Sequence, residues 1–356
     1  MNKEQNGIQI RSAEIDNFRG IKECKIDDLS LVNLFIGINN SRKSTILDAI
    51  YIGCKEFRAS SLIPVIKERV QREVLPYEIF YSYDENSKAE VKLKYNPEYE
   101  YSISFSIAQD EIDEGENKKI EKGQLYSCFE GDNSIRNLTA YVKNKSPNHL
   151  VKLTVGKEID RYSDGARIFS STINKKELTT MLDAMLGQIK INRKKETDLI
   201  NRMSDIYREE FDYEFIPRLE DRKDKRVAFG NERIFSDFHG DGMQRALLFL
   251  SALELTSDTA IFIEEIEMFQ HPKALKRLAK HTVDLAMKNR IQLFITTHNY
   301  DTFVGYALDT RKNDINTVKE QEKLFRSYIL TNKDGIVDAK IENDPTKIAD
   351  ELHFND

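Results

Sequence analysis

The chain has 356 residues, of which 40% are hydrophobic and 32% are charged, and 54 basic and 60 acidic side chains give a formal net charge of −6. This composition is typical of globular proteins and excludes a disordered or fibrous chain. The near balance of charge excludes a general attraction to nucleic acid and leaves only a local basic face open. No apolar run approaches the roughly 20 residues that cross a bilayer, and the polar start is unlike a signal peptide. We therefore expect a cytoplasmic protein with no membrane partner.

The N-terminal region predicts short strands, because apolar and polar residues nearly alternate over 8–16 and again over 21–26. A short apolar strand at 31–36 runs straight into Gly37. Apolar residues at helical spacing follow over 44–57. The order strand, glycine, helix is the local context that a phosphate-binding loop requires.

The middle of the chain divides into a strand-like and a helical part. From about 76 to 166 the pattern predicts short strands, interrupted at 110–122 by a charge-dense stretch that we expect to be an exposed loop. From about 174 to 226 the pattern predicts helices. Basic and acidic side chains interleave over 190–226, which favours a solvated face over a nucleic-acid patch.

The last third returns to alternating helices and strands. The pattern predicts an apolar helix at 246–255, a buried strand at 260–263, an amphipathic helix at 272–287 and a second buried strand at 291–295. Strands separated by helices indicate a mainly parallel sheet that is covered on both faces. The cysteines lie far apart, without metal-ligand spacing, and we expect buried thiols at Cys24, Cys54 and Cys128.

The segment GINNSRKST fits the phosphate-binding loop G-x-x-x-x-G-K-[ST] at every position except the second glycine, which is Arg42. Backbone N–H groups of such a loop surround the phosphates, the lysine reaches the β/γ oxygens and the serine hydroxyl binds Mg²⁺. Arg42 is a departure, since a Cβ disfavours the backbone conformation that glycine allows. The alternative is a plain strand–turn–helix corner. The candidate nucleotide-binding residues are Gly37, Asn39, Asn40, Ser41, Arg42, Lys43, Ser44 and Thr45.

Two adjacent carboxylates end the strand at 260–263, and a histidine ends the next one. Glu264 can hold the metal, while Glu265 polarises the attacking water. His298 follows the strand at 291–295 and has the position of a γ-phosphate sensor. Taken singly, a carboxylate pair at a strand end is often only solvated, and a histidine there is often structural.

Two glycines open the apolar helix that precedes these strands. Gly240, Asp241 and Gly242 provide a second helix N-terminus that can bind an anion. The alternative is an ordinary glycine-rich helix entry.

These four elements, in this order, resemble the ABC ATPase superfamily, with a Walker A loop, a signature, a Walker B strand and a switch histidine. More narrowly, the chain resembles the SMC-like branch that contains the OLD family and the ATPase subunits of bacterial defence and toxin modules. The opening residues 17–20 and 32–37 are similar to that branch, as are Ile263 to Glu267 and the pair His271-Pro272. The double glutamate, in place of Asp-Glu, is itself OLD-like.

The resemblance implies an α/β fold of the ABC-type ATPase head, a mixed β-sheet with a P-loop core and inserted β-rich and helical segments. We expect a single head that covers the whole chain. Its parts would be a P-loop lobe at 1–57, a β-rich segment at 75–170, a helical segment at 174–235, and a lobe at 236–356 with the signature, Walker B and switch-histidine elements.

The resemblance also implies an ATP-binding and ATP-hydrolysing homodimer with ATP and Mg²⁺ in composite sites between two protomers. Its site residues would be Ser44 and Glu264 for the metal, Glu265 and His298 for catalysis, Arg19 beside the nucleotide, and Gly240, Asp241 and Gly242 on the γ-phosphate of the opposite protomer. His239 replaces the usual serine of the signature.

The implied role is a switch for a separately encoded effector, a nuclease or a toxin, in anti-phage or toxin-type defence. The clustered acidic residues of the Toprim nuclease domain of OLD proteins are absent after His298, so we expect no nuclease activity in this chain. One alternative is a DNA repair or recombination ATPase that acts directly on DNA. The other is a non-enzymatic protein, in which Arg42 has made a nucleotide-binding scaffold with little hydrolysis or a structural scaffold without activity.

Overall fold

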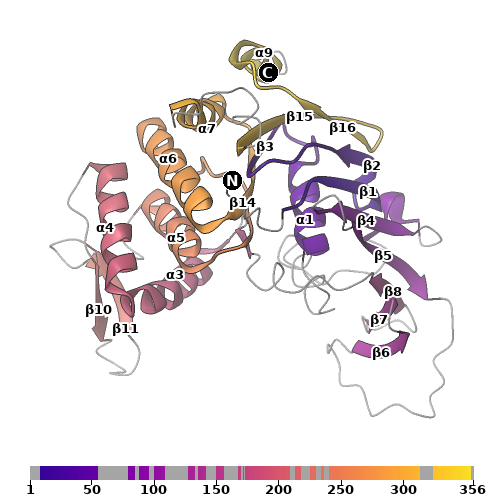
Figure 1. Ribbon diagram of the computed structural model, residues 1–356, viewed down its shortest axis with the longest axis horizontal. Helices are drawn as coiled ribbons and strands as arrows, with labels where there is room; N and C mark the ends of the chain where they lie inside the picture. The colour runs from indigo at the N-terminus through magenta and orange to yellow at the C-terminus, as the bar shows by residue number, and fades with distance from the viewer. Residues whose placement is uncertain are drawn as a thin grey trace, which may run out of the picture. The chain divides into compact units, whose positions relative to one another are not determined.

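The computed structural model describes residues 9–54, 79–84, 88–95, 100–108, 127–132, 135–141, 150–155, 167–169, 171, 173–208, 213–217, 225–229, 234–235, 240–312 and 324–353. The chain forms two compact units that interleave along the sequence (Figure 1). Unit 1 comprises Met1–Ser30, Phe35–Arg167 and Tyr328–Ile341, and unit 2 comprises Leu31–Leu34, Ile168–Ser327 and Glu342–Asp356.

Unit 1 is built on strands in the order β6-β7-β8-β5-β4-β1-β2-β16-β15. Their bounds are Ser12–Phe18 (β1), Ile21–Ile26 (β2), Ala89–Lys94 (β4), Glu100–Ala108 (β5), Ser127–Asp132 (β6), Ile135–Tyr141 (β7), Leu150–Val155 (β8), Phe325–Lys333 (β15) and Ile336–Ile341 (β16). Neighbouring strands of this series run antiparallel, except that β16 is parallel to β2.

Helix α1 (Lys43–Cys54) begins inside the predicted phosphate-binding loop and packs on β1 and β4. Its side chains Ile46, Leu47 and Ile50 are fully buried. Buried aliphatic side chains at helical spacing explain why the helix forms here, since a stripe of this kind must face a core. The helix therefore fixes the loop that precedes it to the sheet of unit 1.

The core of unit 2 contains a short series of strands. Their order is β3 (Val32–Ile36), β14 (Ile291–Thr297), β13 (Thr259–Ile263) and β9 (Arg167–Phe169). Strands β13 and β14 are parallel and buried along their whole length. This burial explains their continuous apolar sequences, which are typical of parallel strands covered on both faces.

The other part of unit 2 is helical (Figure 1). Its helices are α3 (Lys175–Lys190), α4 (Arg193–Tyr207), α5 (Asp241–Leu255), α6 (Pro272–Asn289), α7 (Tyr300–Lys312) and α9 (Pro345–His353). Helix α5 packs against α3 and α6, and α6 also packs against α4 and α7. A separate antiparallel sheet consists of β10 (Tyr213–Pro217), β11 (Lys225–Phe229) and β12 (Ile234–Phe235). In the described part of the chain no helix is long and apolar enough to span a membrane.

Most of the predicted elements are confirmed, and one is wrong. The helical pattern predicted from 174 to 226 holds over α3 and α4 but ends at Tyr207, because β10, β11 and β12 follow. Aromatic and β-branched residues at 213–216 and 227–229 favour strands, and the helical pattern does not extend over them. The charged stretch 110–122 lies outside the described residues.

The expectation of buried thiols is confirmed at two positions. Cys24 and Cys54 are buried and unbridged. Burial raises the pKa of the Cys24 thiol to about 12, with smaller contributions from Asp338 and Asp16. Cys24 is therefore a small apolar side chain of the core and not a reactive thiol.

The start of α5 packs so tightly that it gives a first prediction. A Cβ added at Gly242 would lie 2.3 Å from the Phe269 carbonyl oxygen. We expect Gly242→Ala to lower the free energy of unfolding by about 1–3 kcal/mol, because the backbone must shift to admit the methyl group. Gly187 in α3 is the matched control, since no described atom lies within 4 Å of a Cβ placed there.

Gly187→Ala should instead raise the free energy of unfolding by roughly 0.5–1 kcal/mol, because alanine is the better helix former. Urea denaturation of the full chain measures both variants. An unchanged or raised free energy of unfolding in Gly242→Ala would contradict the close contact between α5 and Phe269.

Candidate functional site

The predicted phosphate-binding loop is closed around the ammonium group of Lys43. Its Nζ donates to the carbonyl oxygens of Gly37 and Ile38, at 2.6 and 2.9 Å, and Lys43 is only 7% exposed. A Cβ at Gly37 would lie 2.6 Å from the Ser41 hydroxyl and 2.9 Å from the Leu330 carbonyl oxygen, so only glycine fits at this position. The loop therefore has the curled backbone and the central cation that a phosphate site needs.

Arg42 adopts a left-handed backbone conformation, which is the reason why the general pattern has a glycine at this position. Its φ is 69°, and that of Asn40 is 68°, both in the left-handed region. A residue with a Cβ pays roughly 1–2 kcal/mol for this conformation. The Arg42 side chain lies over the β1–β2 turn, because a Cβ added at Gly20 would meet its Cζ at 2.6 Å. The missing side chain of Gly20 thus provides the room for the guanidinium group.

Arg19 is held next to the same helix. Its Nη1 donates to Oδ2 of Asp48 at 2.7 Å, and Asp48 is fully buried in α1. A fixed partner of this kind is unlike an ordinary surface arginine in a turn. Unit 1 therefore brings Arg19 and the loop to one end of α1.

The other residues predicted for the loop are placed as follows. Asn39 and Asn40 are exposed, Ser41 is buried, and Ser44 and Thr45 are half-buried in the first turn of α1. The Asn332 amide donates to the Asn40 carbonyl oxygen at 3.4 Å. The exposed part of the loop, with the first turn of a helix behind it, is suited to an anionic ligand.

The two carboxylates after β13 have different surroundings. Glu264 is buried, and its Oε2 accepts from the backbone N–H and the hydroxyl of Ser171, both at 3.0 Å. The Glu265 side chain is 30% exposed, with a left-handed backbone at φ 48°. Its N–H donates to Oγ1 of Thr296 at 3.1 Å. One carboxylate is therefore fixed inside unit 2 and the other can meet water.

His298 lies between two carboxylates. Its Nδ1 is 3.9 Å from Oε1 of Glu265 and 3.3 Å from Oε1 of Glu267. Parallel pairing explains the proximity, because Ile263 of β13 is opposite Ile295 of β14 and both strands end at the same edge. Within unit 2 the structure thus brings together the predicted Glu265 and His298, with Glu264 next to them in the chain.

Glu267 enters the sequence analysis only in the resemblance to the SMC-like branch. Burial raises the pKa of the Glu267 carboxyl, and hydrogen bonds from the His298 N–H and the Thr297 hydroxyl partly offset this increase. The spacing Glu265-x-Glu267 after a buried strand is the only sequence signal for this residue. Ser171, the partner of Glu264, left no such signal.

The glycines that open α5 differ in exposure. Gly240 is exposed and precedes the first helical residue, while Gly242 is buried under the Phe269 carbonyl. Asp241 lies 3.6 Å from the Lys175 ammonium group. Predicted Gly242 therefore has a packing role, whereas Gly240 and Asp241 face outward. His239 lies outside the described residues.

Arg245 connects the start of α5 to the carboxylates, although the sequence did not single it out. Its Nη2 donates to the Ser171 carbonyl oxygen at 3.2 Å, and its guanidinium lies 5.4 Å from the ring centre of Phe269. Burial lowers the pKa of Arg245, while Asp241 and Glu265 raise it. The α5 terminus and the turn after β13 thus form one connected part of unit 2.

Comparison with known proteins gives matches that cover most of this chain and most of the other protein. The chain is 23% identical over 351 residues to an ATP/GTP phosphatase of Helicobacter pylori, an alignment that covers 89% of this chain and 91% of that protein. A solved structure of the Smc head bound to the C-terminal winged-helix domain of ScpA is similar, with a TM-score of 0.52, 12% identity, and 94% and 97% of the two chains covered.

A second solved structure, of the Smc head domain with an extended coiled coil from Pyrococcus furiosus, also has a TM-score of 0.52, with 11% identity and 97% and 99% of the chains covered. The expected ABC-type ATPase head fold is thereby confirmed. Residues 32–304 match the protein family described as "AAA domain, putative AbiEii toxin, Type IV TA system". This match spans most of the chain, from β3 to α7, and the protein belongs to that AAA-domain family.

Proposed function

We propose that the protein binds ATP with Mg²⁺ and hydrolyses ATP. The observation that carries the proposal is the Lys43 ammonium, buried in a loop whose own carbonyl oxygens of Gly37 and Ile38 surround it. A buried cation needs compensation, and a triphosphate would supply it through charge-assisted hydrogen bonds. The Helicobacter pylori relative, named an ATP/GTP phosphatase, supports the same activity.

Hydroxyl and carboxylate oxygens are the ligands that a hard divalent cation prefers. The Ser44 hydroxyl, at the start of α1, and the Glu264 carboxylate, at the end of β13, would hold Mg²⁺. When bound, Mg²⁺ would neutralise charge on the phosphate oxygens. Glu265, the more exposed carboxylate, would accept the proton of the attacking water, and His298 would contact the γ-phosphate.

We further propose that two copies form a homodimer through composite ATP sites. Gly240 and Asp241 would present the N-terminus of α5 to the γ-phosphate bound by the opposite protomer. Lys175, 3.6 Å from Asp241, would offset the negative charge that this aspartate brings. A dimer closed by two nucleotides opens again after hydrolysis, which gives a switch.

The partner of this switch would be a separately encoded nuclease or toxin in a defence module, in keeping with the SMC-like and OLD-like resemblance. The family description, which names a toxin of a type IV toxin–antitoxin system, supports this setting. The solved Smc head that binds ScpA is an example of a similar fold with a protein partner. A nuclease or toxin gene next to this one would support the assignment.

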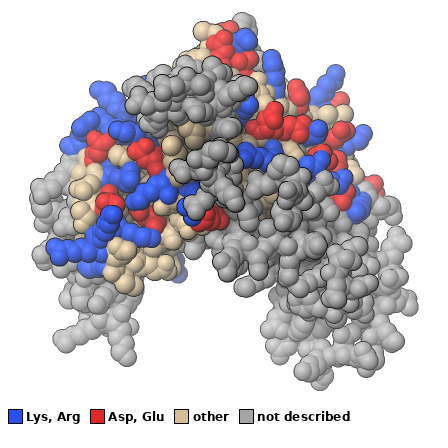
Figure 2. All heavy atoms as spheres, viewed as in Figure 1, with Lys and Arg blue, Asp and Glu red and all other residues tan. Residues whose placement is uncertain are grey.

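Direct action on DNA is the second candidate. Figure 2 shows Lys and Arg atoms next to Asp and Glu atoms over the helices of unit 2. Charged side chains of the unit 2 helices form ion pairs, for example Lys288 with Asp198 at 3.5 Å and Lys276 with Asp301 at 3.7 Å. Paired charges are a poor phosphate-binding surface, so this face disfavours DNA. Binding at low salt that weakens steeply as salt rises would favour it.

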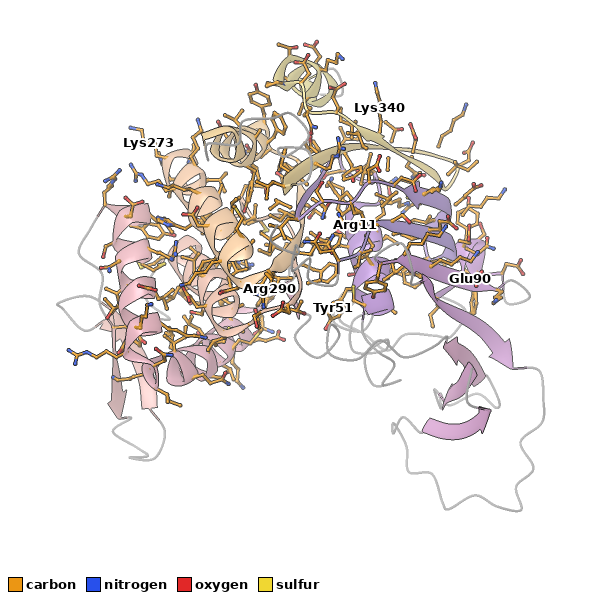
Figure 3. All side chains as sticks on the ribbon, viewed as in Figure 1. Arg11, Tyr51, Glu90, Lys273, Arg290 and Lys340 are labelled. Carbon is orange, nitrogen blue, oxygen red and sulfur yellow. The ribbon has the colours of Figure 1, made fainter. Side chains whose placement is uncertain are left out.

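Replacement of Lys43 tests the nucleotide site. We expect Lys43→Ala to weaken ATP binding at least about tenfold, or ~1.4 kcal/mol, because the cation that faces the β/γ-phosphates is lost. The matched control is Lys340→Ala, which removes an exposed lysine on β16 (Figure 3). Titration with a fluorescent ATP analogue measures both. Equal affinity of Lys43→Ala and the wild type would overturn the site.

Replacement of Glu265 tests the general base. We expect Glu265→Gln to bind ATP normally and to release phosphate about 100-fold to 10,000-fold more slowly, the usual size of general-base effects. The slow variant should also accumulate as an ATP-bound dimer in light scattering. Glu90→Gln, on β4 and labelled in Figure 3, is the control. Normal hydrolysis by Glu265→Gln would place the base elsewhere.

The pairing of Arg42 with Gly20 gives the test that separates a nucleotide-binding loop from a structural scaffold that does not bind ATP. Arg42→Gly should change ATP affinity less than about threefold, since the guanidinium already lies over the β1–β2 turn. Gly20→Ala should weaken ATP binding about tenfold, because the new methyl group displaces that guanidinium. Gly20→Ala combined with Arg42→Gly should restore the affinity.

ATP titration of the wild type and the three variants would also detect the opposite case. Absent binding in the wild type together with tight binding in Arg42→Gly would show that Arg42 blocks the loop. That result would favour the scaffold.

A further inference from the structure

Glu267 is buried in the turn after β13, and its carboxylate faces the end of β14. Its Oε1 accepts from the Thr297 hydroxyl at 2.8 Å and from the His298 backbone N–H at 3.0 Å. The same oxygen lies 3.3 Å from the ring Nδ1 of His298. Three groups of two consecutive residues therefore converge on one oxygen atom.

Such a group is costly to keep in a core. Glu267 is 9% exposed, and its second oxygen, Oε2, has no hydrogen-bond partner among the described residues. Burial raises the pKa of its carboxyl despite the hydrogen bonds that lower it, so the folded protein disfavours the ionised form. An apolar side chain of similar size would often stabilise the fold as well or better. Stability alone does not account for Glu267.

The surroundings of Glu267 point instead to His298. Thr297 is fully buried, and its Oγ1 also accepts from the Asn299 N–H at 3.0 Å, which fixes the chain on the far side of the histidine. On the neighbouring strand end, the Glu265 N–H donates to Thr296. The ends of β13 and β14 are thus joined at two points, by Glu265 with Thr296 and by Glu267 with Thr297 and His298.

We propose that Glu267 is a positioning residue that holds the backbone and the imidazole of His298 at a set distance from Glu265. The inference rests on the proposed function, in which Glu265 is the base and His298 meets the γ-phosphate. Because Oε1 lies on the Nδ1 side of the ring, Nε2 is the nitrogen that would face the phosphate. A loss of Glu267 would release His298 without removing any group that contacts ATP.

A double-mutant cycle tests whether Glu267 acts through His298. We expect Glu267→Gln to lower kcat for phosphate release about 10-fold to 100-fold, the usual cost of losing a residue that orients a functional side chain, with KM little changed. In the His298→Ala background the same substitution should change kcat less than about twofold. Equal factors in both backgrounds would overturn the proposal.

The matched control is Glu342→Gln. Glu342 is also 9% exposed and accepts a backbone N–H, from Asp344 at 3.0 Å, but it lies in the segment before α9. We expect an unchanged kcat in this control. Thr297→Val is a second variant that keeps the carboxylate and removes one of its donors, and it should lower kcat in the same direction.

Unfolding separates positioning from a structural role. The folded pKa of Glu267 is raised, so its ionised form lowers stability at pH values above the ordinary pKa of a glutamate, and this cost disappears in Glu267→Gln. We expect the variant to unfold at the same or a higher temperature at neutral pH, with kcat reduced. A lower Tm with a kcat loss that is equal in both histidine backgrounds would instead assign Glu267 to the fold.

A measurement without nucleotide keeps this inference distinct from the proposed ATPase activity. The chain has six histidines, and ring signals in NMR of histidine-labelled protein can be assigned to His298 through His298→Ala. Glu267→Gln should shift the His298 signals, whereas Glu342→Gln should leave them in place. Shifted signals in a protein that releases no phosphate would refute the ATPase and retain the contact. Unshifted signals would refute the positioning role itself.

Discussion

Parallel pairing of β13 with β14 is the constraint on which the carboxylate side of the site depends. The register sets Ile263 opposite Ile295, so the next residues of both strands emerge at one edge of unit 2. Both strands are buried along their length, and Phe262 stacks on Phe294 at 4.8 Å between ring centres. Charged side chains can therefore appear only where the strands end. A shift of the register by one residue would turn every side chain of the shifted strand to the opposite face. It would also separate Glu265 from His298.

The turn after β13 shows how the edge is kept in one conformation. Glu265 and Phe269 both have left-handed backbones, with φ of 48° and 62°. Such conformations cost of order 1–3 kcal/mol each and persist only where neighbouring contacts impose them. Here the Gln270 amide donates to the Gly242 carbonyl oxygen, and Tyr207 donates to Gln270 at 3.1 Å. The same contacts that bury Gly242 thus support the strained turn that carries Glu265.

The features that could be predicted from the sequence are those that depend on residues close together in the chain. A strand, a loop and a helix are neighbours in the chain around Gly37, and a buried strand reveals itself by its composition, so the loop, β13 and β14 could be predicted. Features that depend on distant segments could not. Ser171 bonds to Glu264 across 93 positions, and Asn33 bonds to the Leu293 carbonyl oxygen across 260. The interleaving of the two units has the same origin. The strands at 213–229 are a different case, because they pair with each other and their aromatic and β-branched residues favour strands.

Arg42 shows how a departure from a motif can be compatible with the shape that the motif serves. The glycine of the general pattern is required for a left-handed backbone, and Arg42 adopts this backbone with φ of 69°. The cost, roughly 1–2 kcal/mol, is small beside the ~8 kcal/mol of a micromolar ligand. What the loop cannot tolerate is a bulky side chain that occupies the phosphate position. In this chain the bare residue is on the facing turn, at Gly20, so the guanidinium has a place outside the loop. The loop therefore depends on two positions. Arg42 adopts the left-handed backbone, and the missing side chain of Gly20 leaves room for the guanidinium group.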